Sequence, residues 1–184
     1  MRSNKELRLE IERGLDAGQS KVAIYASLLD EYEKATALGI LAQTSTRDLQ
    51  QKYRIANNTL IGLLVCITAI KIIVAMPLLL SINPAASALL ILLLPALNLF
   101  LIWGVANHKA AVYLFAACLS LSALGNVVDA FGKSRTPLII TLNIASLVMV
   151  VAIIFLAIFL MRKLFPNTTF FLQPKRGANE QPLL

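Results

Sequence analysis

The sequence is poor in the residues that build metal centres and disulfide frameworks. Its 184 residues include two cysteines and one histidine, His108. A metal site needs several such ligands at close spacing. Cys66 and Cys118 each lie alone in an apolar run, which is typical of free thiols rather than of a disulfide pair. We therefore expect no metal ion, no cofactor and no disulfide.

Common catalytic motifs are also missing. The chain has no HExxH, GxSxG or Walker sequence. His108 and Lys109 lie in a short turn without an acidic neighbour, which is typical of loop residues rather than of a general base. We therefore expect a protein that is not an enzyme.

Charge is scarce in the middle of the chain. Charged residues make up 15% of the sequence, against roughly 25% in soluble domains. The interval 55–161 contains only five of them, which are Lys71, Lys109, Asp129, Lys133 and Arg135. A polar N-terminal region followed by a long uncharged interval is typical of a polytopic membrane protein.

Four apolar stretches are long enough to cross a bilayer, which takes ~20 residues in a helix. They cover about 58–80, 85–106, 110–128 and 137–161. The connections between them are short, so neighbouring helices should be antiparallel. We predict an all-α fold with a cytosolic helical hairpin and stalk (1–55), a four-helix transmembrane bundle (56–162), and a cytosolic tail (163–184) that is either interfacial or disordered.

Basic residues at the ends of the apolar stretches predict the orientation. Arg47, Lys52 and Arg54 precede the first stretch, and Arg162 and Lys163 follow the fourth. Because cytoplasmic flanks are enriched in lysine and arginine, both termini should be cytosolic. No apolar signal region occurs in the first 20 residues. The alanine- and leucine-rich composition and short loops suggest a bacterial inner membrane.

Aromatic residues fit the same orientation. Trp103 and Tyr113 flank the turn at 107–109, at the level where amphipathic rings prefer the membrane interface. Phe165, Phe170 and Phe171 precede a basic pair and would suit the cytosolic interface. The alternative is a disordered tail.

The N-terminal region carries helix start and stop signals. Ser3 and Glu6 form a capping box, Gly18 suits a left-handed helix end, and Ser20 can cap a second helix. We expect that second helix to continue to Ala42. A third helix, starting near 47, should run without interruption into the first apolar stretch.

One face of the predicted second helix is apolar and aromatic. Its leading members are Tyr25, Leu28, Leu29 and Tyr32. Two short helices bury little area alone, so this face should pack on the first helix, the stalk, the membrane surface or a partner. We predict it as a partner-binding face. The helix is acidic, which disfavours nucleic acid.

Lys71 lies within the first apolar stretch, ~20 Å from its cytosolic end at 1.5 Å per residue. A charge near the bilayer centre costs about 2.5–3.5 kcal/mol. The lysine therefore either snorkels outwards or finds a partner, and Asp129 is the acidic residue within reach. We predict an intramembrane polar cluster of Lys71, Asn98, Asn126, Asp129 and Asn143. It either fixes helix register or binds an ion, proton or ligand.

These features favour a non-catalytic integral membrane protein that acts by binding another protein. It would be an accessory subunit, an assembly factor or an immunity-type protein against a membrane-active toxin. The alternative is a protomer of an oligomeric channel or small transporter that uses the cluster around Lys71. The expected partners are membrane lipid and a protein, and self-association into a homo-oligomer is a further option.

Overall fold

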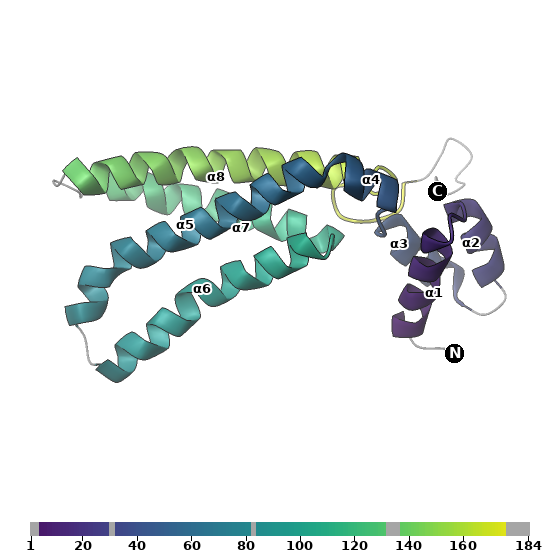
Figure 1. Cartoon of the computed structure of the whole chain (residues 1–184), viewed down its shortest axis with the longest axis horizontal. Helices are drawn as coiled ribbons and strands as arrows, with labels where there is room; N and C mark the ends of the chain where they lie inside the picture. The colour runs from purple at the N-terminus through teal and green to yellow at the C-terminus, as the bar shows by residue number, and fades with distance from the viewer. Residues whose placement is uncertain (1–3, 30–31, 82–83, 132–136, 176–184) are drawn as a thin grey trace. The chain divides into compact units, whose positions relative to one another are not determined.

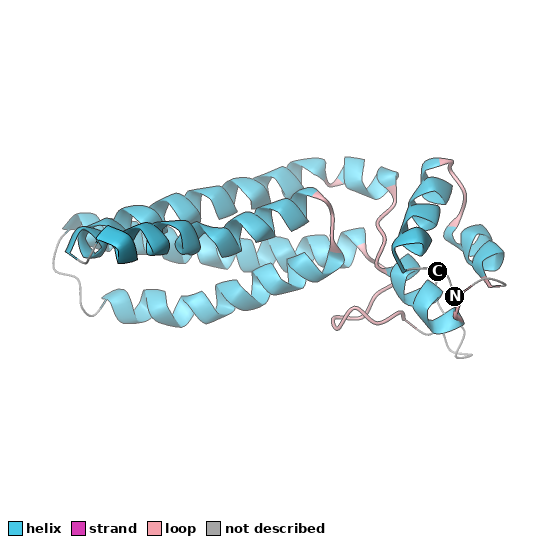
Figure 2. Ribbon diagram, turned by 90° about the horizontal axis from the view of Figure 1, so that it is seen from below, coloured by secondary structure: helices cyan, strands magenta, loops and turns pink. Residues whose placement is uncertain are grey.

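A computed structural model describes residues 4–29, 32–81, 84–131 and 137–175. Side chains are described in these ranges except at 77–94 and 126–136. Over the described residues the fold is all-α (Figures 1 and 2). The helices are α1 (Asn4–Asp16), α2 (Lys21–Leu28), α3 (Lys34–Ala42), α4 (Arg47–Lys52), α5 (Arg54–Ser81), α6 (Pro84–Ala106), α7 (Ala110–Phe131) and α8 (Pro137–Leu164). The predicted all-α class is confirmed.

The chain divides into two compact units. The first comprises residues 1–54, 108–111 and 160–184, and the second comprises 55–107 and 112–159. The first unit therefore joins the N-terminal helices to the segment that follows α8. The second unit consists of the apolar helices.

Two helices are long and apolar enough to cross a membrane, namely α5 over Arg54–Met76 and α8 over Pro137–Leu164. Over most of its length, each of these helices carries apolar side chains, which are compatible with the hydrocarbon core of a bilayer. Helices α6 and α7 contribute the shorter described apolar segments Pro95–Ala106 and Ala110–Gly125. Each helix begins and ends within a few residues of the predicted stretch.

The predicted second helix, expected to reach Ala42, is instead two helices. Helix α2 ends at Leu28, and α3 begins at Lys34 with Glu33 as its N-cap. The reason is packing: in one straight helix Ile24 and Leu41 would lie about 26 Å apart at 1.5 Å per residue, yet both belong to one core cluster. The chain must therefore turn back between them.

The predicted continuous helix into the first apolar stretch is also wrong. Helix α4 ends at Lys52, and Tyr53 separates it from α5 with φ −103° and ψ 14°. The Tyr53 amide still donates to the Leu49 carbonyl at 3.0 Å. The interruption is therefore a single non-helical residue rather than a loop.

The helix signals around α2 act as the sequence predicts. Gly18 adopts φ 76° after α1, a left-handed conformation that costs glycine no Cβ clash. The Ser20 Oγ accepts a hydrogen bond from the Ala23 amide at 3.2 Å and caps α2. The predicted capping residue Ser3 lies outside the described residues.

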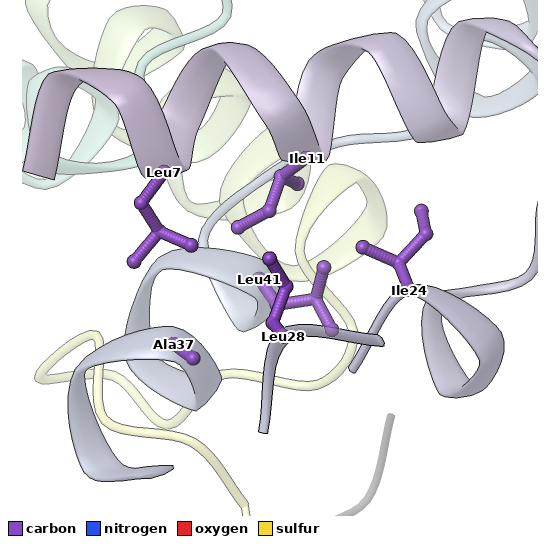
Figure 3. Close-up of a cluster of buried hydrophobic side chains, with 6 residues drawn as sticks. All are labelled: Leu7, Ile11, Ile24, Leu28, Ala37 and Leu41. Carbon is purple, nitrogen blue, oxygen red and sulfur yellow. The ribbon is translucent and has the colours of Figure 1, made fainter. Parts of the chain in front are cut away.

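An apolar core holds the three N-terminal helices together (Figure 3). Each helix contributes two buried side chains, namely Leu7 and Ile11 from α1, Ile24 and Leu28 from α2, and Ala37 and Leu41 from α3. Burial stabilises each of the leucine and isoleucine side chains by about 1.5–3 kcal/mol relative to exposure. The N-terminal helices therefore form a packed unit rather than an open hairpin.

Candidate functional site

The predicted polar cluster is described only in part. Asn98 on α6 is buried and donates from Nδ2 to the Thr68 Oγ1 on α5 at 2.8 Å. Thr68 in turn donates from Oγ1 to the Leu64 carbonyl at 2.6 Å. The hydrogen-bond partner of Asn98 is therefore Thr68, which is not a member of the predicted cluster.

One feature of the sequence points to Thr68 as a further member of the polar cluster. Thr68 lies three residues before Lys71 on α5, so the two share one helix face. Thr68 is buried whereas Lys71 is exposed. A threonine can bond to the carbonyl four residues earlier, so it enters an apolar run without an orphan hydroxyl.

The grouping of the other members of the predicted cluster stays a prediction. Asn143 is buried on α8. The side chains of Asn126 and Asp129 lie outside the described residues. A pairing of Lys71 with Asp129 therefore stays a prediction.

A second polar network joins three of the apolar helices. The Tyr113 Oη on α7 donates to the Asn57 Oδ1 on α5 at 2.6 Å, and the Asn57 Nδ2 donates to the Val105 carbonyl on α6 at 3.3 Å. Tyr113 is 0% exposed. The Tyr113 ring therefore lies inside the helix packing, where its hydroxyl has a partner, and its depth at the membrane interface stays a prediction.

Polar groups inside the second unit serve its packing. Among the described side chains, no buried nitrogen or oxygen atom lacks a hydrogen-bond partner. An unsatisfied polar group in hydrocarbon costs several kcal/mol. Asn57, Thr68, Asn98 and Tyr113 thus act as links between helices, and their hydrogen-bonding capacity is used within the chain.

The predicted partner-binding face points largely into the first unit. Leu28 is buried in the core, and Tyr25 and Tyr32 pack against that core half-buried. Leu29 is also half-buried. A partner cannot contact Leu28 without opening the core.

The outer face of α2 is uncharged. Val22 is 61% exposed, and Ala23, Ala26 and Ser27 are exposed beside it. A surface helix normally turns charged and polar side chains to water. This exposed face of α2, comprising Val22, Ala23, Ala26 and Ser27, is the α2 outer face below.

Lys21 ties the start of α2 to the end of α3. Its Nζ donates to the Leu41 carbonyl at 3.0 Å and to the Thr44 carbonyl at 2.6 Å. A positive charge there faces the negative end of the α3 dipole. Burial lowers the pKa of Lys21 to about 8, because desolvation disfavours the charged amine.

His108 is the histidine considered above as a metal ligand or general base. His108 adopts φ 49° in the turn between α6 and α7, and burial lowers its pKa. Within the described ranges, no group of three or more histidine, cysteine, aspartate or glutamate side chains lies close enough to hold a metal ion.

Comparison with known proteins adds no assignment. No family model, no characterised protein and no solved structure matches this chain.

Proposed function

We propose that this chain is a non-catalytic integral membrane protein in which four apolar helices anchor a cytosolic helical unit that binds another protein. The observation that carries the binding role is the uncharged α2 outer face on a unit whose own core is already filled. Surface helices normally turn charged side chains to water, so an exposed helix face without charge is a candidate contact surface for a partner.

Several observations support a membrane anchor of four helices. Each of the apolar helices exposes a large apolar side chain, namely Val65 on α5, Phe100 on α6, Phe115 on α7 and Phe155 on α8, the last of these 73% exposed. Water disfavours such a surface, whereas lipid accepts it.

The hydrogen bonds of the second unit support the same anchor. Asn57 links α5 to both α6 and α7 near the start of α5, and Asn98 links α6 to α5 again deeper along the helices. Helices α5 and α6 are joined at two levels and should share a depth, and α7 is joined to α5 at one of these levels. Helices α6 and α7 would therefore lie in the bilayer with α5.

The orientation follows from charge and can be tested directly. Basic residues before α5 and at the end of α8 favour both termini in the cytosol, and the alanine- and leucine-rich composition favours a bacterial inner membrane. Reporter fusions at each terminus should both give the cytosolic signal. Opposite signals would refute the four-span anchor.

The binding role predicts that charge on the α2 outer face abolishes partner capture. The full chain would be purified in mild detergent, and a stoichiometric companion protein is the expected result. Ala26→Glu introduces a carboxylate into the face and should lose that companion. Arg8→Gln, an exposed site on α1 with the same change in charge, should retain it.

The result that refutes the binding role is equally specific. A folded Ala26→Glu protein that still holds its companion would exclude the α2 outer face. The identity of the companion would then decide between an accessory subunit, an assembly factor and an immunity-type protein.

One observation favours the channel alternative. Lys71 lies three residues after buried Thr68 and seven after buried Leu64, on the face of α5 that packs inwards, yet its side chain is exposed. A charged side chain on such a row would suit an ion path between protomers. Ion flux in reconstituted liposomes that changes with Lys71→Gln would favour this alternative.

A further inference from the structure

A short hairpin follows α8, drawn in yellow in Figure 1. The Thr169 amide donates to the Gln173 carbonyl at 2.7 Å, and the Lys175 amide donates to the Asn167 carbonyl at 2.9 Å. The Leu172 amide donates to the Thr169 carbonyl at 3.0 Å and closes the turn. Residues 167–175 form the hairpin referred to below.

Side-chain hydrogen bonds fix the hairpin at both ends. The Lys175 Nζ donates to the Pro166 carbonyl at 2.6 Å, so the base is tied to the end of α8. The Gln43 Nε2, just after α3, donates to the Leu172 carbonyl at 3.0 Å. The hairpin therefore connects α8 to the N-terminal helices.

The tip of the hairpin presents two aromatic rings. Phe170 and Phe171 are the central residues of the turn, and they are 46% and 78% exposed. Their rings meet edge to face with centroids 5.7 Å apart. Turns that face only water favour asparagine and glycine at such positions.

The backbone conformation of Leu172 indicates that the turn at the tip of the hairpin is held in one conformation. Its φ of 61° is in the left-handed region that glycine normally occupies after such a turn. A branched side chain there is strained, and strained residues mark sites where surrounding contacts enforce a function. Here the enforced feature is the exposed phenylalanine pair.

The position of the hairpin along the chain brings these rings to a membrane surface. Phe171 is seven residues beyond Leu164, the last residue of α8, which allows a reach of at most about 25 Å. Arg162 and Lys163 are exposed in the last turn of α8. With Lys175 they make three basic residues over 162–175, a segment without an acidic one.

We propose that Phe170 and Phe171 insert at the boundary between headgroups and acyl chains of the cytosolic leaflet, while the three basic residues contact anionic headgroups. Aromatic rings prefer this boundary, and anionic lipid attracts juxtamembrane lysine and arginine. Through Gln43, the inserted hairpin holds the N-terminal helices at the membrane surface. This inference rests on the proposed function, because it needs α8 to span the bilayer.

Quenching by brominated lipid tests the inference. The full chain would be reconstituted into vesicles of phosphatidylcholine and phosphatidylglycerol that carry bromine at either a shallow or a deep acyl position. In a Trp103→Phe, Phe171→Trp variant, the indole at the hairpin tip should be quenched more by shallow bromine than by deep bromine. Unchanged far-ultraviolet circular dichroism would show that the variant folds.

The unsubstituted chain separates this inference from the proposed function. Its tryptophan, Trp103, is exposed on α6 and reports insertion of the apolar helices. If Trp103 is quenched and the hairpin indole is not, the hairpin inference is overturned while the membrane anchor stands. If neither is quenched, the anchor itself is refuted, and the inference falls with it.

A charge arm tests the headgroup contacts. Lys163→Gln should shift the equilibrium between inserted and free hairpin by about fivefold, because each basic residue near an anionic surface contributes about that factor. The shift should vanish in vesicles of phosphatidylcholine alone. An equal shift in both kinds of vesicle would overturn the role assigned to anionic lipid.

Other occupants of the tip would give distinct results. A tip that binds a partner protein would stay unquenched in protein-free vesicles. A tip that binds a second copy of the chain would respond to the protein-to-lipid ratio rather than to the depth of the bromine. Either result overturns the inference.

Discussion

The two units of this chain differ in what they expose and in the polar side chains that they bury beside an apolar interior. The N-terminal helices bury a cluster of leucine, isoleucine and alanine side chains and carry most of their charge outside. The apolar helices carry phenylalanine and valine outside and bury Asn57, Asn98 and Tyr113. In water apolar burial drives packing, whereas in lipid packing and hydrogen bonds between helices do so. The difference is the one expected if the helices of the second unit lie in a membrane, as proposed above.

The largest expected effect comes from emptying the apolar core. Leu41→Ala removes a fully buried side chain and should lower the free energy of unfolding of the N-terminal helices by about 3 kcal/mol. Hydrogen exchange of the protein in detergent would measure it, and α5–α8 should keep their protection. Val22→Ala, at an exposed site, should change little. An equal loss of hydrogen-exchange protection in both units would contradict the distinction between them.

A matched glycine pair tests close packing in the second unit. A Cβ at Gly104 would lie 2.3 Å from the Val112 Cγ2, whereas a Cβ at Gly62 would meet nothing within 4 Å. Valine is stiff at χ1 and cannot swing away. Gly104→Ala should therefore destabilise by about 2 kcal/mol.

The control is Gly62→Ala, which should be neutral or stabilising by up to about 1 kcal/mol, because alanine favours helix. Thermal unfolding in mild detergent would compare the two variants. Similar unfolding temperatures for both would show that α6 and α7 do not meet as described.

Removing one hydroxyl tests the polar links. Tyr113→Phe deletes the bond to Asn57 and should destabilise by about 1 kcal/mol, a typical value for hydrogen bonds between membrane helices. In an Asn57→Leu background the same substitution should have less effect, since the acceptor is already gone. Additive effects in the double variant would contradict a direct link.

A further expected effect is a pH dependence in the first unit. The pKa of Lys21 is lowered to about 8 from 10.5, so between these values the unfolded chain binds more protons than the folded one. The free energy of unfolding should therefore rise with pH from about 8 to 10.5. Lys21→Met should flatten this rise, and denaturant titrations across the range would measure it. A fall with pH would contradict the assigned pKa.

Local features of the fold could be predicted from sequence because their causes are local. Gly18 and Ser20 act through their own backbone and side chain, and runs of apolar residues fix where α5 and α8 lie. These signals need no knowledge of the neighbours.

Features that depend on a packing partner could not be predicted. The apolar stripe continues through Leu28 into α3, so periodicity alone gives no sign of the turn between α2 and α3. An apolar stripe also indicates that a helix face is buried, but it does not identify the surface that covers it. The sequence therefore predicts Leu28 on a partner-binding face, whereas the structure buries it in the core of the first unit. Tyr113 and Thr68 carry ordinary local signals, and their roles follow from Asn57 and Asn98 on other helices.

The order of the polar links along the chain bears on how the four-span anchor would assemble. Thr68 bonds to a carbonyl of its own helix, so α5 can enter lipid alone without an orphan hydroxyl. Asn98, made later by the ribosome, then meets an acceptor that is already in place, and Tyr113 likewise follows Asn57. Asn57 differs, because its Nδ2 donates to the Val105 carbonyl on α6. Synthesis would thus supply the acceptor oxygens for Asn98 and Tyr113 before those donors arrive, whereas the Asn57 amide would be paired only once α6 is made.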